Sequence, residues 1–84
     1  MDFVFSNHSL QQMKQRGISQ QQAEIVLAHP QQVIKENGKE IYQSIVNFEN
    51  EGDYLLRIFV NATVNPKLVI TVYRTSKISK YYEG

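Results

Sequence analysis

The spacing of apolar residues predicts a helical first third of the chain and a strand-forming remainder. Leu10 and Met13 share one side of a helix predicted from about His8 to Arg16. Ser6 or Asn7 precedes this helix and is typical of a helix start, because a short side-chain oxygen accepts from free N–H groups. The glycine after Arg16 ends the helix, since glycine readily adopts the left-handed conformation of a helix terminus.

A second helix is predicted to begin at Ser19. Ser19 and Gln22 have the spacing of a capping box, in which each side chain bonds to the other residue's backbone N–H. An i, i+3, i+4 apolar stripe starts at Ala23, and Pro30 ends the helix because the residue before proline avoids helical angles. The two helices are separated by Gly17 and Ile18 alone, so we expect a compact helical pair.

The rest of the chain has the pattern of β-strands joined by turns. Asn37-Gly38 is a strong hairpin signal, because both residues tolerate positive φ. Asn50 to Asp53 and Asn65-Pro66 mark two further turns. We therefore expect an antiparallel meander of four strands over residues 32–36, 40–48, 54–61 and 68–74, preceded by a short strand or extended lead-in over residues 3–5.

Alternation along the last two strands predicts which side chains the helices cover. One face carries Tyr54, Leu56, Ile58 and Val60 from the third strand and Leu68, Ile70 and Val72 from the fourth. Two helices cover one face of such a sheet, so the fold class is α+β, with both N-terminal helices on one face of a four-stranded antiparallel sheet. The other face is then open to solvent, and we expect it to present Arg57, Phe59, Thr71, Tyr73 and Thr75.

Composition restricts the class of protein further. The chain of 84 residues is expected to form one domain over residues 1–84, and it contains no cysteine for disulfides or thiolate metal sites. No apolar run approaches the roughly 20 residues of a membrane-spanning helix. Asp2 stands where a signal peptide carries a cation, so a cytoplasmic location is expected.

Charge is unevenly distributed, although the net charge is only +1. Between Tyr54 and Tyr82 the chain has no acidic residue, and the first helix carries the cations Lys14 and Arg16 without an acid. A segregated field of this kind attracts a polyanion. The cations of the second half are Arg57, Lys67, Arg74, Lys77 and Lys80.

A hairpin between the last two strands brings Arg57 opposite Thr71 or Tyr73 on the expected open face. A guanidinium, a phenol and hydroxyls together suit a phosphate backbone and an aromatic platform for a base. The alternative interpretation is an Arg–Tyr pair that merely decorates an exposed sheet. Two isolated histidines and scattered acids provide no metal-ligand set, and no glycine-rich phosphate loop is present, so we expect no metal and no cofactor.

Three stretches of the chain together resemble a known family. They are His8-x7-Arg16-Gly17-Ile18-Ser19, the Asn37-Gly38 hairpin, and the run from Leu68 through Thr71, Tyr73, Thr75 and Lys77 to Lys80-Tyr81-Tyr82. The pattern is similar to small bacterial domains of unknown function that are grouped with the BrnT, RelE and ParE toxins, in the barnase–colicin–RelE-like ribonuclease fold. The resemblance covers nearly the whole chain.

This resemblance implies a metal-independent endoribonuclease toxin that cleaves RNA by attack of the ribose 2′-hydroxyl on the adjacent phosphate, and a cognate antitoxin protein as partner. By this analogy Arg57 stabilises the phosphate, and Tyr73 stacks a base or transfers a proton. His8 is the candidate base, and Arg16 is a second cation or a structural brace. The expected nucleic-acid-binding residues are Lys14, Thr71, Arg74, Thr75, Lys77 and Lys80.

Two other functions stay open at this point. The same face suits a non-catalytic module that binds RNA or DNA, and Tyr81, Tyr82 and Phe59 suit a protein-docking patch. Within the toxin interpretation, ribosome-bound mRNA, free RNA and a protein target such as that of ParE toxins all remain open.

Overall fold

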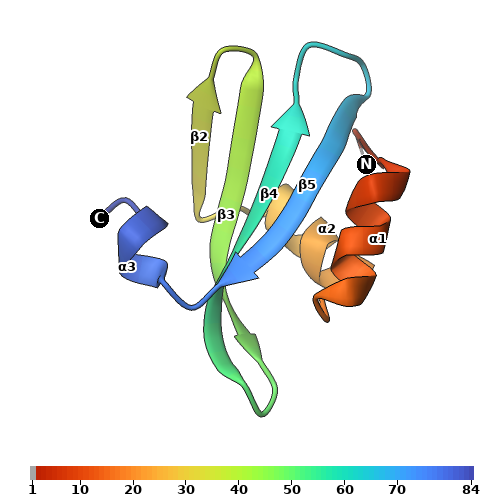
Figure 1. Ribbon diagram of the computed structural model, residues 1–84. Coiled ribbons are helices and arrows are strands. Elements are labelled where there is room, and N and C mark those ends of the chain that lie inside the picture. The colour runs from red at the N-terminus through yellow and green to blue at the C-terminus, as the bar shows by residue number, and fades with distance from the viewer. Residues whose placement is uncertain (1) are drawn as a thin grey trace.

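The computed structural model describes residues 2–84 and has an α+β architecture, with two helices beside one face of a twisted sheet and a third helix at the other side (Figure 1). Within the described residues, no helix is long and apolar enough to cross a membrane. In chain order the elements are β1 (Phe3–Phe5), α1 (Asn7–Gln15), α2 (Gln20–Ala28), β2 (Gln32–Glu36), β3 (Lys39–Phe48), β4 (Gly52–Asn61), β5 (Lys67–Thr75) and α3 (Ile78–Tyr81).

Both predicted N-terminal helices are confirmed, with the predicted chemistry at their ends. The Ser6 hydroxyl oxygen accepts from the backbone N–H of Ser9 at 3.1 Å. At the start of α2 the capping box is complete, because Ser19 and Gln22 each bond the other's backbone N–H. Gly17, between the helices, has φ of +67°, which a residue with a side chain adopts only with strain.

The sheet has five strands rather than four, in the order β1-β5-β4-β3-β2, and it is mixed rather than purely antiparallel. β1 pairs parallel with the start of β5, with Phe3 opposite Lys67 and Phe5 opposite Val69. The prediction of a four-stranded antiparallel sheet was therefore wrong at this edge. A three-residue strand whose partner lies more than 60 residues away leaves no turn signal in the sequence.

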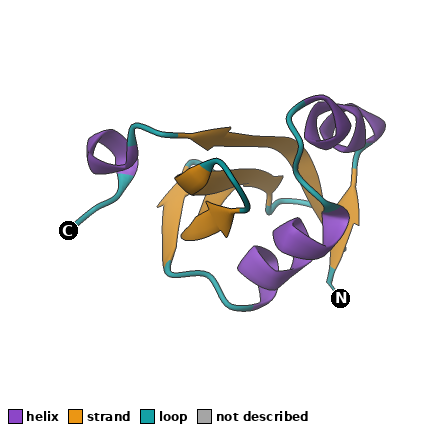
Figure 2. Cartoon of the chain, turned by 90° about the horizontal axis from the view of Figure 1, so that it is seen from below, coloured by secondary structure: helices purple, strands orange, loops and turns teal. Residues whose placement is uncertain are grey.

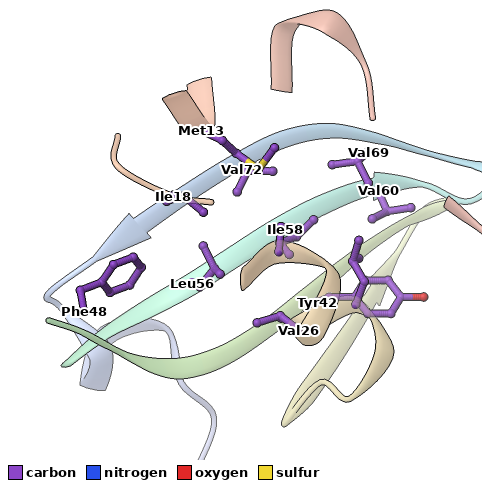
Figure 3. Packing of buried hydrophobic residues seen from close by; sticks show 12 residues of the cluster. Met13, Ile18, Val26, Tyr42, Phe48, Leu56, Ile58, Val60, Val69 and Val72 are labelled. Atoms are coloured by element: carbon purple, nitrogen blue, oxygen red, sulfur yellow. The ribbon is translucent and has the colours of Figure 1, made fainter. Parts of the chain in front are cut away.

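One hydrophobic core lies between the helical pair and the sheet (Figure 3). Leu56, Ile58 and Val60 are fully buried there, as predicted for β4. In β5 the prediction was wrong in part, because the register shifts between Phe59 and Val60, where Val60 pairs with Val69. This bulge gives Val69 the buried place that simple alternation assigned to Ile70. The helical pair contributes Met13, Ile18, Ala23, Val26 and Leu27.

The opposite face of the sheet is partly covered, which the sequence did not predict. α3 lies on the other side of the molecule from α1 and α2 (Figures 1 and 2). The carbonyl of Tyr81, at the end of α3, accepts a 3.1 Å bond from the Gln43 side chain on β3. Leu55 is fully buried and Arg57 is 8 % exposed on this face, whereas Phe59, Thr71, Tyr73 and Thr75 are half-buried. The expected open face is therefore only partly open, and Arg57 is not exposed on it.

α1 satisfies the free edge of β5 beyond the short β1 strand. The backbone N–H of Val72 donates to Gln12 Oε1 at 3.2 Å, and Arg16 Nη1 donates to the Val72 carbonyl at 2.8 Å. Two α1 side chains thus act in place of a neighbouring strand. This contact fixes the C-terminal end of α1 beside the second half of β5.

A polar cluster ties β3 to the start of β5. Glu40 Oε1 accepts from Lys67 Nζ at 2.9 Å and from the Tyr42 hydroxyl at 2.7 Å. Hydrogen bonds from Lys67 and then Tyr42 lower the pKa of Glu40, although burial opposes this effect. Burial, followed by the bond to Glu40, raises the pKa of Tyr42. The carboxylate form of Glu40 therefore stabilises the folded chain.

We predict that Glu40→Gln lowers the free energy of unfolding by about 1–2 kcal/mol at neutral pH, because Lys67 loses its ionic partner. The folded pKa of Glu40 is depressed, so its contribution is present above the unfolded pKa and is lost as the pH falls through the folded pKa. Urea denaturation from pH 7 to pH 3 should show that the unfolding free energies of the wild type and of Glu40→Gln converge in acid. Glu36→Gln, at an exposed site on β2, is the control, and a constant difference across this pH range would contradict the assignment.

Candidate functional site

A solvent-open pocket of about 490 Å³ lies at the free edge of β5, beside the end of α1. Its position follows from the fold, because α1 ends here and β5 continues past β1 without a neighbouring strand on that side. Its walls carry two guanidinium groups, two phenol rings and one hydroxyl, and no carboxylate. The lining residues are Arg16, Tyr54, Thr71, Tyr73 and Arg74.

Arg74 is the most constrained of these side chains. Its guanidinium lies 4.3 Å from the centre of the Phe48 ring and 4.7 Å from the centre of the Tyr54 ring. Nη2 donates to Glu51 Oε1 at 2.9 Å. Nη1 is buried, and no described residue accepts a hydrogen bond from it. A buried N–H donor without an acceptor is costly, so the hydrogen bonding of the Arg74 guanidinium is incomplete within the described chain.

Arg16 supplies the second positive charge of the pocket from the C-terminal end of α1. One of its guanidinium nitrogens is used by the Val72 carbonyl, which leaves further donors of the planar fork without a described protein acceptor. Arg16 therefore acts as the structural brace that the sequence analysis left open, and it also lines the cationic pocket. The two roles are compatible, because the hydrogen bond to the Val72 carbonyl holds the Arg16 guanidinium in position beside the pocket.

Arg57 lies outside this pocket, in a buried cluster on the other face of the sheet. Its Nε donates to Gln43 Oε1 at 2.8 Å, and its Nη1 donates to the Tyr73 hydroxyl at 2.7 Å. The guanidinium also stacks on three rings, with the Tyr81 ring centre at 4.5 Å and the Phe59 ring centre at 5.3 Å. Neutral acceptors and aromatic faces thus solvate the charge. The expectation that Arg57 is exposed on an open face, where it would meet a phosphate, was therefore wrong, because Arg57 is buried.

Tyr73 connects the edge pocket with the buried cluster around Arg57. Its ring lies close to the Phe59 ring, at 5.9 Å between centres and 23° between planes, and its hydroxyl accepts from Arg57. The same residue lines the edge pocket with Thr71. The structure therefore brings Arg16, Tyr73, Arg74 and Thr71 together, all of which were candidate site residues.

The other candidates do not line the pocket. His8 is exposed in the first turn of α1, about 12 Å along the helix axis from Arg16 at about 1.5 Å per residue. Lys14 is exposed on the same helix. Lys77 and Lys80 are exposed after β5, where the Thr75 hydroxyl accepts from the Lys77 backbone N–H at 3.1 Å. None of these four residues shares the cavity.

Sequence analysis missed Tyr54, Phe48 and Glu51 as parts of this site. The alternation of side chains along β5 contained the signal for these residues. Arg74 lies on the same face of β5 as Val72, and it pairs with Leu56 on β4. An arginine at an inward position near a strand end needs rings or acids around it. The long β3–β4 hairpin supplies both, since its turn holds Glu51 and its ends hold the two rings.

Within residues 2–84, no group of three or more His, Asp or Glu side chains is placed to hold a metal ion. Two guanidinium groups can bind a phosphate, the phenols can stack against a base or move a proton, and Thr71 can donate to an oxygen.

We predict that Arg57→Met lowers the free energy of unfolding by about 2–3 kcal/mol, because the Gln43 carbonyl oxygen and the Tyr73 hydroxyl lose their donor and the ring contacts are lost. Lys77→Met, at an exposed site, should change it by less than about 0.5 kcal/mol. Chemical denaturation of both variants makes the comparison. An Arg57→Met protein as stable as Lys77→Met would contradict the buried network.

Comparison with known proteins identifies a family for this chain. A family model described as "Domain of unknown function (DUF4258)" matches residues 5–74, which run from the last residue of β1 to the penultimate residue of β5 and include every residue that lines the edge pocket. α3 lies outside the matched range. No curated protein and no solved structure matches the chain. Because the match covers most of its length, the chain belongs to the DUF4258 family.

Proposed function

We propose that this protein is a metal-independent endoribonuclease of the bacterial toxin type, related in fold to RelE and BrnT toxins, and that it holds its RNA at the edge pocket. The observation that carries the proposal is that the Arg74 and Arg16 side chains line one open pocket together with two phenols, and that the hydrogen bonding of Arg74 is incomplete at Nη1. Paired guanidinium groups suit a phosphate, and aromatic rings suit an unstacked base.

The reaction begins when the ribose 2′-oxygen attacks the adjacent phosphorus and loses its proton to a base. The bond from phosphorus to the 5′-oxygen breaks, and that oxygen takes a proton from an acid. The products end in a 2′,3′-cyclic phosphate and a 5′-hydroxyl. Arg74 and Arg16 would stabilise the charge that builds on the phosphoryl oxygens. Among the lining residues, Tyr54 and Tyr73 carry the phenols that can transfer protons.

The toxin class implies a cognate antitoxin protein that silences the enzyme. Support for this partner comes from the resemblance carried by the Arg16-Gly17-Ile18-Ser19 step and by the last strand. An antitoxin that blocks the edge pocket would need acidic side chains, since the pocket presents two cations and no carboxylate among its lining residues.

A second candidate is a non-catalytic RNA-binding module that uses the same pocket. It is favoured by the positions of two expected catalytic residues, because Arg57 is buried among its own partners and His8 is remote from the cavity. The docking interpretation has less support, since the Tyr81 ring is already engaged by Arg57. RNA binding without products separates the binding module from the enzyme.

We predict that purified protein cleaves 5′-labelled single-stranded RNA at low salt in the presence of EDTA. Arg74→Lys keeps the charge but loses the planar donors and the ring stacking, and it should cut the cleavage rate about 100-fold. Lys35→Gln, at an exposed cation on β2 outside the pocket, should stay within about twofold of the wild type.

The outcomes separate the candidates. RNA left intact but bound, with an affinity that falls steeply as salt rises, would assign the chain to the binding module. RNA neither cleaved nor bound would reject both functions. Equal loss of activity in Arg74→Lys and Lys35→Gln would reject the edge pocket as the site, and circular dichroism of each variant checks that it is folded.

A further inference from the structure

Glu51 is placed to act on any anion that enters the edge pocket, although it does not line the cavity. It lies in the β3–β4 turn, and its carboxylate bonds Arg74 Nη2 at 2.9 Å while half of its side chain is exposed. Its backbone N–H donates to the Phe48 carbonyl at 2.9 Å, which anchors the turn beside the ring that Arg74 stacks on. The carboxylate is therefore held next to the guanidinium that faces the pocket.

Because of Glu51, the net charge around the pocket is lower than that of two arginines alone. Arg16 and Arg74 contribute two positive charges, and the Glu51 carboxylate offsets one of them. An internal phosphodiester of RNA carries one negative charge, whereas a terminal phosphate monoester carries nearly two above its second pKa of about 6. A site with a net charge of +1 matches the diester.

We propose that Glu51 is a specificity-determining residue, which makes the edge pocket a site for internal phosphodiesters and disfavours terminal phosphate monoesters. This inference rests on the phosphate-binding part of the proposed function. Its physical basis is that the repulsion between the Glu51 carboxylate and a bound anion is proportional to the charge of that anion. The carboxylate therefore weakens binding of a dianion more than binding of a monoanion.

Proportionality to charge gives a quantitative test. Removing the Glu51 charge should strengthen monoester binding by the square of the factor by which it strengthens diester binding. For a carboxylate several ångströms away under water-like screening, these factors are about threefold for the diester and about tenfold for the monoester. A structural effect of the substitution would instead change both affinities by a similar factor.

The experiment compares dimethyl phosphate with methyl phosphate at pH 8 and low salt, in NMR titrations that follow the backbone amides of Gly17 and Arg74. Gly17 is a suitable reporter, because a Cβ at this position would lie 3.6 Å from Arg74 Nη2. Glu51→Gln keeps an oxygen that accepts from Arg74 and removes only the charge. Glu49→Gln removes an exposed charge from the same turn and is the matched control.

The expected result for Glu51→Gln is a squared response, in which the affinity for the monoester rises by the square of the factor by which the affinity for the diester rises. In Glu49→Gln the ratio of the two affinities should stay unchanged. Equal factors for both anions in Glu51→Gln, the squared response in Glu49→Gln as well, or no binding of either anion by any variant would each overturn the inference. RNA cleavage is measured in parallel on the wild type. A squared response from a protein that leaves RNA intact would reject the ribonuclease and keep the anion site.

Discussion

The free edge of β5 is the constraint on which the arrangement of the site depends. β1 pairs with only the first three residues of β5, so the backbone beyond them needs other partners. Gln12 and Arg16 supply those partners at Val72, and they bring the end of α1 against the strand. The guanidinium that satisfies this edge is the same one that lines the cationic pocket. A requirement of folding thereby sets the position of a proposed functional group.

Two arginines on neighbouring strands meet opposite conditions. Arg57 donates from Nε to Gln43 and from Nη1 to Tyr73, and aromatic rings lie over its guanidinium, so neutral groups of the chain itself surround its charge. Arg74 is equally enclosed by rings, yet one of its nitrogens has no described acceptor. Their positions decide which of them is available to a ligand, because Arg74 lines the solvent-open pocket and Arg57 does not. Arg57 holds Tyr73 in place by a hydrogen bond, whereas Arg74 lines the open pocket and can hold a phosphate there.

The capping residues and the Asn37-Gly38 turn determined much of the fold from sequence, because helix ends and tight turns depend on local chemistry. The parallel pairing of β1 and the cover by α3 were not predictable in this way, since both depend on contacts between residues far apart in the chain. The bulge at Ile70 was also not predictable, and it changed which residues of β5 face the core. For the site, alternation identified Thr71 and Tyr73. It placed Arg57 on an open surface, because no local pattern predicts that Tyr81 returns to cover this side chain.

The most direct measurement is of which arginine side chain meets the RNA backbone. A 2′-O-methyl dinucleotide cannot be cleaved by 2′-oxygen attack, so it can be titrated while the guanidinium signals of ¹⁵N-labelled arginines are recorded. We expect the Arg74 guanidinium signals to shift and their protons to exchange with water more slowly when the phosphate binds, whereas the Arg57 signals stay unchanged. Shifts confined to Arg57, with Arg74 unaffected, would contradict it.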